Sequence, residues 1–313
     1  MFALVAFAFA CNSNDNEGDD NPRQPMRSVY HWKTTYDPTP AEEAFMRDHG
    51  VGRLYLHYFD VVTGDDQAEP AATLRFVKTP DAALEVVPTI YITTEAMSQI
   101  ASAGDPDFFK AYADKMVTRV TAMNSRNHIV NVHEIQIDCD WTQSLRKPYF
   151  KLLEALHDCL ASKGWLLSVT IRLHQLSQPI PPVDRGVLML YNTGNLMSVK
   201  THNSILDYED VKPYFARTVK YDLPLDFAYP AFGWKVYYRG DKFECMASLT
   251  DTTSHPGCTV RVEQADFKTV DSVKKLAQGA LGTDNSSVII YHLDEQSLKK
   301  FTADEVEKIY GVR

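Results

Sequence analysis

A chain of 313 residues, 44% of them hydrophobic and 11% aromatic, is long and apolar enough to bury a large core, in one barrel-sized domain or two smaller ones. This composition excludes intrinsic disorder for most of the chain. A formal net charge of −9, with no run of basic residues, argues against nucleic acid as a partner.

The first segment, Phe2 to Ala10, is wholly apolar, too short to span a bilayer, and followed at once by Cys11. It predicts a secretory signal peptide. Small residues at Ala8 and Ala10 resemble a bacterial lipoprotein signal, which makes Cys11 the lipidated residue and the new N-terminus. The segment departs from that pattern because Phe9 replaces a small residue and no Lys or Arg precedes the apolar run. A buried apolar start of a cytosolic protein is the alternative.

Residues 12–27 follow this signal of residues 1–11, and their first nine residues carry four acids and no bases. Such a polar, acidic stretch predicts a flexible tether. It resembles the acidic export signal that follows the lipid-bearing cysteine in surface lipoproteins of Bacteroidetes-type bacteria. The resemblance implies a protein anchored by its lipid in the bacterial outer membrane, at the cell surface.

Short apolar strands alternate with amphipathic helices through residues 28–313, the pattern of a parallel sheet. The eight candidate strands are Ser28–Lys33, Arg53–Asp60, Val86–Thr93, Glu134–Trp141, Leu166–His174, Gly186–Asn192, Leu225–Tyr229 and Val288–Leu293. The candidate helices are Pro40–His49, Pro106–Met123, Leu145–Ser162, Tyr208–Arg217, Asp266–Gln278 and Thr302–Ile309.

Eight strands with helices between them predict a single α/β domain over residues 28–313, a closed (β/α)8 TIM barrel. A doubly wound open sheet is the alternative. The segment after the first strand, residues 33–38, has no G-x-G-x-x-G and no Walker lysine pattern, so no cofactor is predicted. Residues 231–263, between the seventh and eighth strands, predict a strand-rich insertion over the barrel mouth.

The fourth strand carries two carboxylates on one side. A side-chain period of two sends Gln136, Asp138 and Asp140 into the barrel, and sends Cys139 and Trp141 toward the surrounding helices. Two acids on one face raise each other's pKa when both lose water, which suits one of them to hold a proton near neutrality. The alternative is that they bind backbone amides or a nearby arginine and only close the barrel top.

The active site of a TIM barrel forms at the carboxyl ends of its strands, and polar and aromatic residues gather there in this sequence. Carboxylates beside flat rings are what glycoside hydrolysis requires, because one acid protonates the leaving oxygen and the rings stack on sugars. The candidate catalytic residues are Asp138, Asp140 and Glu295, and the candidate substrate-binding residues are Trp32, Tyr58, Arg172, His174, Tyr191, Asn192, Tyr229 and Asp294.

Three motifs in chain order resemble glycoside hydrolase family 18, the chitinase-like barrels. Asp138-Cys-Asp-Trp141 resembles the end of the family's strand-four signature, and Met189-Leu-Tyr-Asn192 resembles its M-x-Y-D/N on strand six. The run from Leu223 to Trp234 resembles the strand-seven region. The resemblance implies a barrel whose Tyr191 and Asn192 help hold a sugar's N-acetyl group.

One departure from the family pattern changes what the resemblance implies. Thr142 stands where the family has its proton-donating glutamate, and a hydroxyl cannot act as the general acid. Two interpretations follow for a glycan partner. In a catalytic one, Asp140 donates the proton, Asp138 tunes it and Glu295 is the second carboxylate; in the other, the protein binds glycan or has a structural role without catalysis.

Other site chemistries have weaker support. His31, His57, His174 and His292 at one rim suggest metal binding, but no H-x-H or H-E-x-x-H motif accompanies them, so no metal site is predicted. Export also places the cysteines in a disulfide-permissive compartment. Cys245 and Cys258 flank a Thr/Ser/Pro/Gly-rich connection that a disulfide would close, whereas Cys139 and Cys159 are expected to be free thiols, with a disulfide between them as the alternative.

Overall fold

The structure, a computed structural model, describes residues 24–216, 221–281 and 286–311. The signal peptide, its Cys11 and residues 12–23 of the expected tether lie outside the described residues. No helix within the described ranges is long and apolar enough to cross a membrane.

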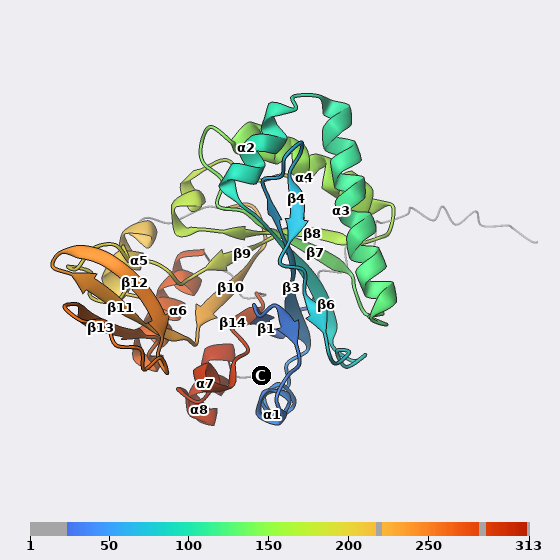
Figure 1. Cartoon of the computed structure of the whole chain (residues 1–313). Coiled ribbons are helices and arrows are strands. Elements are labelled where there is room, and N and C mark those ends of the chain that lie inside the picture. The colour runs from blue at the N-terminus through green and yellow to red at the C-terminus, as the bar shows by residue number, and fades with distance from the viewer. Residues whose placement is uncertain (1–23, 217–220, 282–285, 312–313) are drawn as a thin grey trace, which may run out of the picture.

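Eight parallel strands form a closed barrel, as predicted (Figure 1). Strand β1 pairs with β3 on one side and with β14 on the other, which closes the ring and excludes the open doubly wound sheet. The barrel strands are β1 (Arg27–His31), β3 (Arg53–Val62), β6 (Glu85–Ile92), β7 (Glu134–Asp138), β8 (Leu166–Ile171), β9 (Arg185–Met189), β10 (Leu225–Pro230) and β14 (Val288–Tyr291). Short strands β2 (Thr35–Tyr36), β4 (Glu69–Ala71) and β5 (Arg75–Phe76) lie beside the ring.

Helices surround the strands. The helical segments are α1 (Pro40–Asp48), α2 (Thr94–Ser102), α3 (Pro106–Arg126), α4 (Arg146–Ala161), η1 (Leu173–Ser177), α5 (Tyr208–Val211), η2 (Lys212–Phe215), α6 (Phe267–Leu281), α7 (Glu295–Leu298) and α8 (Ala303–Tyr310). Capping boxes start α1 at Thr39 and α8 at Thr302, as their sequences indicate. The sequence did not predict α2, α7 or the 3-10 helix η1.

Several predicted strands are shorter than expected at their carboxyl ends, and the ends of β7 and β8 matter most for the site. Strand β7 ends at Asp138 and β8 at Ile171, because the backbone leaves the sheet there. Residue Arg172 is already the N-cap of η1, whose Gln175 side chain accepts the Arg172 backbone N–H. Asp140 and His174 therefore lie on the segments that follow the strands and not within the sheet.

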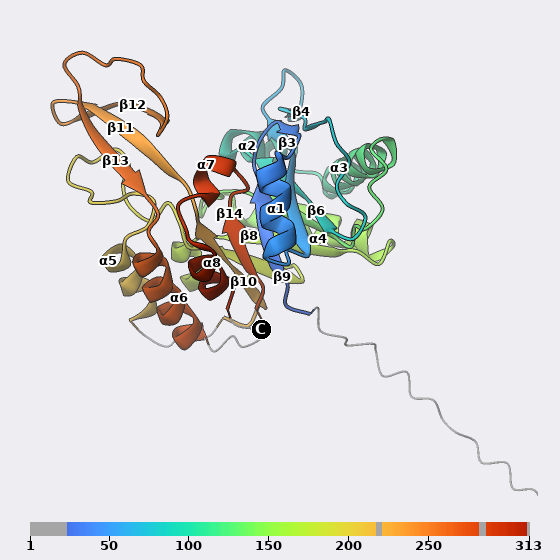
Figure 2. The ribbon, with the colours of Figure 1, turned by 90° about the horizontal axis from the view of Figure 1, so that it is seen from below.

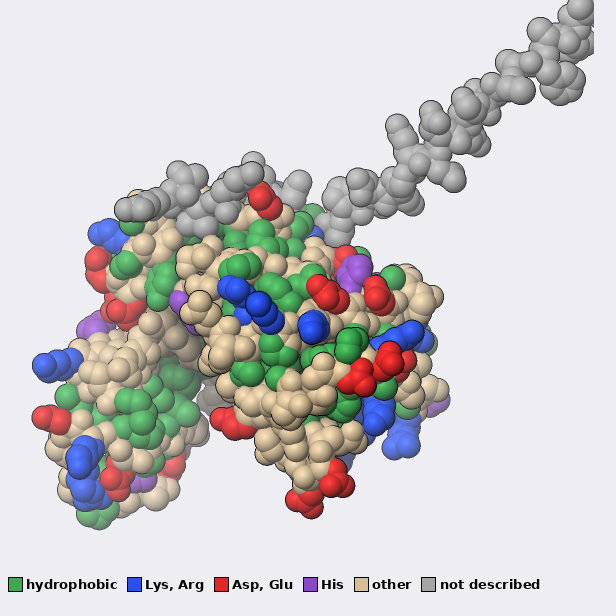
Figure 3. Space-filling view, turned by 90° about the horizontal axis from the view of Figure 1, so that it is seen from above, with side chains coloured by type: hydrophobic (Ala, Val, Ile, Leu, Met, Phe, Trp, Pro, Cys, Tyr) green, Lys and Arg blue, Asp and Glu red, His purple; other side chains and the backbone are tan. Residues whose placement is uncertain are grey.

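The predicted insertion is a three-stranded antiparallel sheet of β11 (Gly233–Arg239), β12 (Lys242–Ser248) and β13 (Thr259–Gln264). It projects from the side of the barrel opposite α3 (Figures 1 and 2). Figure 3 shows it as a lobe apart from the main body, with hydrophobic side chains on its surface; the exposed ones are Met246, Val260 and Val262. Cys245 and Cys258 in this region are both free thiols, as are Cys139 and Cys159.

The barrel interior contains a polar layer around Gln136 of β7. The Tyr30 hydroxyl donates to Gln136 Oε1 at 2.7 Å, and Gln136 Nε2 donates to Ser168 of β8 at 3.4 Å. Gln136 thus points into the barrel, whereas Trp141 stacks on Tyr149 of α4 with ring centroids 6.2 Å apart. Both orientations agree with the side-chain alternation predicted for this segment.

We expect Gln136→Leu to lower the free energy of unfolding by about 1–3 kcal/mol, because it leaves the buried Tyr30 hydroxyl without an acceptor. The double variant Gln136→Leu with Tyr30→Phe removes the donor as well, and should lose less than the sum of the two single changes. Urea denaturation of the four proteins measures this coupling. Strict additivity of the two changes would contradict the pairing.

Candidate functional site

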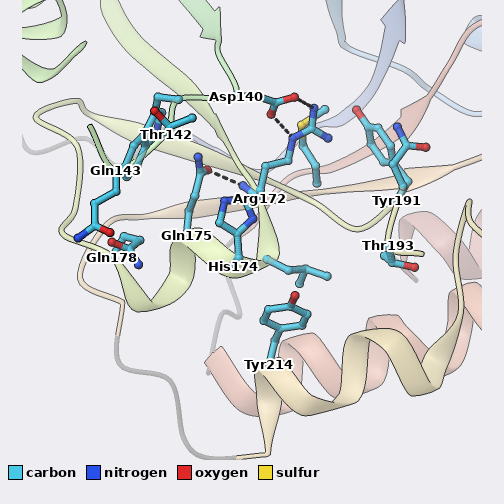
Figure 4. Close-up of a pocket in the computed structure, with 14 residues that line it drawn as sticks. Asp140, Thr142, Gln143, Arg172, His174, Gln175, Gln178, Tyr191, Thr193 and Tyr214 are labelled. Carbon is cyan, nitrogen blue, oxygen red and sulfur yellow. Dashed lines mark hydrogen bonds and ion pairs between the residues drawn. The ribbon is translucent and has the colours of Figure 1, made fainter. Parts of the chain in front are cut away.

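A cavity of about 720 Å³ opens at the carboxyl ends of the strands, on one side of the barrel mouth (Figure 4). Its walls come from the segments that follow β7, β8 and β9, with one residue from η2. The lining residues are Asp140, Trp141, Thr142, Gln143, Arg172, Leu173, His174, Gln175, Gln178, Met189, Tyr191, Asn192, Thr193 and Tyr214. Five of the predicted site residues are among them: Asp140, Arg172, His174, Tyr191 and Asn192.

The carboxylate of Asp140 is held by Arg172 through two hydrogen bonds. Arg172 Nε donates to one carboxylate oxygen at 2.6 Å and Nη2 donates to the other at 3.0 Å. Such a two-point pair fixes both side chains and uses an acceptor site on each oxygen. Burial lowers the pKa of Arg172, but the carboxylates of Asp138 and Asp140 outweigh it and raise that pKa above its ordinary value.

Asp138 lies below this pair and is buried, with 4% of its surface exposed. It accepts a hydrogen bond from the Thr170 hydroxyl of β8 at 2.6 Å. Burial raises the pKa of Asp138, while the positive charge of Arg172 and the Thr170 bond oppose that shift. Asp138 is not among the residues that line the cavity, although its negative charge contributes to the raised pKa of Arg172.

Two buried side chains bring polar groups to the cavity without partners. Gln175 is 2% exposed, and because its Oε1 accepts the Arg172 backbone N–H, its Nε2 is the end left without a hydrogen bond (Figure 4). The Tyr191 hydroxyl, also buried and without a partner, lies on the other side of Arg172. Burial raises the pKa of Tyr191 well above its ordinary value, so the group stays a neutral phenol. Both groups are hydrogen-bond donors buried in the cavity wall.

The outer part of the cavity is lined by exposed amide, imidazole and phenol groups. These residues are Gln143, His174, Asn192 and Tyr214, with Gln178 half-buried beside them. The sequence did not predict Gln143, Gln175, Gln178 and Tyr214, because they lie on irregular segments and on the 3-10 helices η1 and η2, beyond the strand ends that periodicity identifies. Proximity in sequence to Asp140 and Arg172 was the one available signal for the glutamines.

The loop after β9 is held by the insertion. The Tyr238 hydroxyl of β11 donates to the Leu196 carbonyl at 2.8 Å, and Arg261 of β13 donates to the Ser198 carbonyl at 2.9 Å. Thr193, which begins this loop, lines the cavity, and its hydroxyl accepts the backbone N–H of Asp207. The insertion sheet thus supports one cavity wall without lining it.

The structure places the other predicted site residues outside the cavity lining. Trp32 stacks near His57 with ring centroids 4.7 Å apart, and Asp294 binds Lys33 and caps α7. Glu295 pairs with Lys299 at 2.7 Å, and that hydrogen bond lowers its pKa. Two tyrosines are fully buried: the Tyr58 hydroxyl donates to Asn124 of α3, on the helix side of the strand, and the Tyr229 hydroxyl has no partner.

Three of the rim histidines lie near one another, since His292 and His57 both act electrostatically on His31. Among the described residues, no three His, Cys, Asp or Glu side chains form a group that could hold a metal ion. His57 binds Asp60 at 2.6 Å, and burial lowers the pKa of His31 to about 3. Only His174 of the four rim histidines considered in the sequence lines the cavity.

Comparisons with known proteins identify the fold. No protein-family model matches the chain, and no curated protein matches its sequence. Among solved structures, the C-terminal domain of a putative chitinase from Desulfitobacterium hafniense is similar at 10% identity and TM-score 0.58, over 92% of this chain and 100% of that one. A chitinase from Chromobacterium violaceum is similar at 12% identity and TM-score 0.56, over 92% and 100%.

The spore cortex-lytic enzyme SleL of Bacillus cereus is also similar, at 14% identity and TM-score 0.55, over 89% of this chain and 75% of that one. The barrel expected from the family 18 resemblance is therefore confirmed at the level of the fold.

We expect the free energy of unfolding of the Asp138→Asn variant to increase, relative to that of wild type, as pH rises from about 4 to 7. The raised pKa of Asp138 means that the folded protein holds this proton more tightly than the unfolded chain. Its stabilising contribution is full below the ordinary carboxyl pKa and is lost as pH rises through the raised value. Asparagine cannot ionise and keeps an acceptor for Thr170, so urea denaturation at several pH values should reveal the difference.

The exposed Asp158 of α4 provides the control, since Asp158→Asn also removes one carboxylate but from the outer surface. Parallel pH curves for wild type and Asp138→Asn would contradict the effect of burial on Asp138.

Proposed function

We propose that this protein binds glycan in the cavity over β7, β8 and β9, and that it does so without hydrolysing it. The observation that carries this proposal is the two-point pair between Arg172 and Asp140. It leaves the cavity's carboxylate neutralised by a guanidinium, among amide, hydroxyl and imidazole groups. Such groups both donate and accept hydrogen bonds, as a ring of sugar hydroxyls requires.

The acids of the catalytic interpretation do not form a working pair. The two-carboxylate mechanism needs one carboxylic acid to protonate the leaving oxygen and a second carboxylate across an open cleft, about 5–10 Å away, and a substrate-assisted mechanism still needs the proton-donating acid. Asp140 is bound to Arg172, Asp138 is buried below it, and Glu295 is paired with Lys299 outside the cavity lining. At the position of the family's glutamate, the Thr142 hydroxyl pairs with Ser144 at 2.9 Å. Binding requires none of these acids to be free.

The similar structures support a glycan as the ligand. Chitinases are enzymes that act on a polysaccharide, and the Ostrinia furnacalis Group II chitinase domain was solved with an oligosaccharide of N-acetyl sugars. The present chain shares their barrel and carries its cavity at the corresponding end of the strands. Because fold does not fix function, the proposal depends on the lining residues and not on the likeness alone.

The N-terminal residues complete the proposal. An apolar segment ending at Cys11 and an acidic stretch after it support export and lipid attachment, which would hold the barrel at the outer membrane of a bacterium. In that location a glycan-binding cavity faces polysaccharides outside the cell.

We expect at least one glycan in a panel of polysaccharides and oligosaccharides to raise the melting temperature of the protein, with no sugar released. Differential scanning fluorimetry measures the first effect and chromatography of the products measures the second. His174→Ala should weaken binding about tenfold through the loss of one hydrogen bond. His133→Ala, an exposed histidine just before β7, is the matched control and should bind as wild type does. Release of sugar that Asp140→Asn abolishes would overturn the binding-only proposal.

The anchor is tested separately in a bacterial host. We expect the full chain to sediment with outer membranes and to take up a radiolabelled or clickable fatty acid, and Cys11→Ser to lose both properties, because the thiol is the acylated group. Cys258→Ser, which changes a cysteine of the barrel domain, is the control. Unlabelled wild-type protein would contradict the lipid anchor.

A further inference from the structure

A cluster of aromatic rings fills the middle of the barrel mouth. Tyr291, at the end of β14, lies at its centre and stacks on Tyr191 of the cavity with ring centroids 4.6 Å apart. Phe232, Tyr30 and Trp32 surround Tyr291 at 5.5, 5.7 and 6.0 Å. The cluster therefore reaches from the end of β9 to the end of β1 and forms the inner limit of the cavity.

Charged contacts link the elements of the mouth beyond this cluster. Lys33, after β1, binds Glu42 of α1 at 2.7 Å and Asp294 at 3.2 Å. Glu42 also accepts the backbone N–H of Glu295 at 3.1 Å, which ties α1 to α7. These contacts join the helices on both sides of β1. Among the described residues, the cavity lining accordingly includes no residue from the segments that follow β1, β3, β6, β10 or β14.

The opposite side of the cavity is open and carries one accessible aromatic ring. Tyr214 of η2 is 43% exposed, whereas the other aromatic rings of the lining, Trp141 and Tyr191, are 6% and 3% exposed. Figure 4 shows Tyr214 below His174, with its ring directed into the cavity from the η2 side. A flat, half-exposed ring beside hydrogen-bonding groups is a surface on which the apolar face of a sugar stacks.

We infer that the cavity recognises the end of a glycan chain and that the chain leaves over Tyr214, between η1 and η2. This inference rests on the proposed glycan binding. The terminal sugar lies against Arg172, in the part of the cavity walled by Gln175 and Tyr191, and a following sugar stacks on Tyr214. The Tyr291 cluster and the Lys33 contacts separate the cavity from the rest of the barrel mouth, so the cavity does not continue as a groove across the mouth for an internal segment of a long glycan.

The number of protein molecules bound by each glycan chain distinguishes recognition of the glycan end from binding along an internal segment. Taking the best glycan of the panel, oligosaccharides of one to six units and the intact polymer are titrated calorimetrically at known concentrations of chains. End recognition predicts that one protein molecule binds each glycan chain, whatever the length of the glycan. The affinity for each glycan chain should rise over the first few sugar units and then stay constant. Several proteins bound per polymer chain would overturn the inference while leaving glycan binding intact.

Variants of Tyr214 test the exit path. Tyr214→Ala should weaken binding of oligosaccharides about tenfold and leave binding of the monosaccharide unchanged, because only the longer ligands reach the ring. Tyr214→Phe keeps the ring and should bind as wild type does. Trp165→Ala, a half-buried aromatic before β8 at the other end of the barrel, is the control. The inference would be overturned if Tyr214→Ala lost affinity equally for ligands of all lengths, or lost none. If no glycan bound the wild-type protein, the proposed function itself would be refuted.

Discussion

The two-point pair between Arg172 and Asp140 determines what this barrel mouth can do. The Arg172 guanidinium contacts the half-exposed carboxylate of Asp140 and lies close to the buried Asp138, so opposite charges compensate one another at the cavity floor. The same compensation removes the free acid that sugar hydrolysis needs. Arg172 also fixes the side-chain amide of Gln175, because the backbone N–H of Arg172 donates to the amide oxygen. A single residue at the end of β8 therefore sets both the charge and the hydrogen-bonding pattern of the cavity floor.

Much of the fold is predictable from the sequence because the barrel strands are short apolar runs with clear ends. The eight predicted strands all correspond to strands of the ring, and the alternation of side chains correctly directs Gln136 inward and Trp141 toward α4. Periodicity carries no information once the backbone leaves the sheet, so η1, which decides where Arg172 and Gln175 lie, was not predicted. The alternative in which the aspartates bind an arginine agrees with the contacts of Asp140. Sequence spacing could not choose it, because the partner comes from the next strand.

The candidate site was predicted in part for a related reason. Residues at the ends of β7, β8 and β9 converge on one cavity, as a barrel's geometry requires. Residues at the ends of β1 and β14 do not join them, because Tyr291 and its neighbouring rings separate the two halves of the mouth. No local pattern announces such a separation: it arises from which large side chains meet in the middle, and that depends on packing between strands far apart in the chain.

The attachment of the insertion sheet to the loop after β9 has a consequence for how such proteins diversify. Tyr238 and Arg261 hold backbone carbonyls of that loop, so the position of the loop depends on a lobe that contributes nothing to closing the ring of strands. Changes in the length or sequence of this lobe can move one wall of the ligand site while the barrel core stays as it is. Selection for new ligands thus has a region to act on that is separate from the residues on which folding depends.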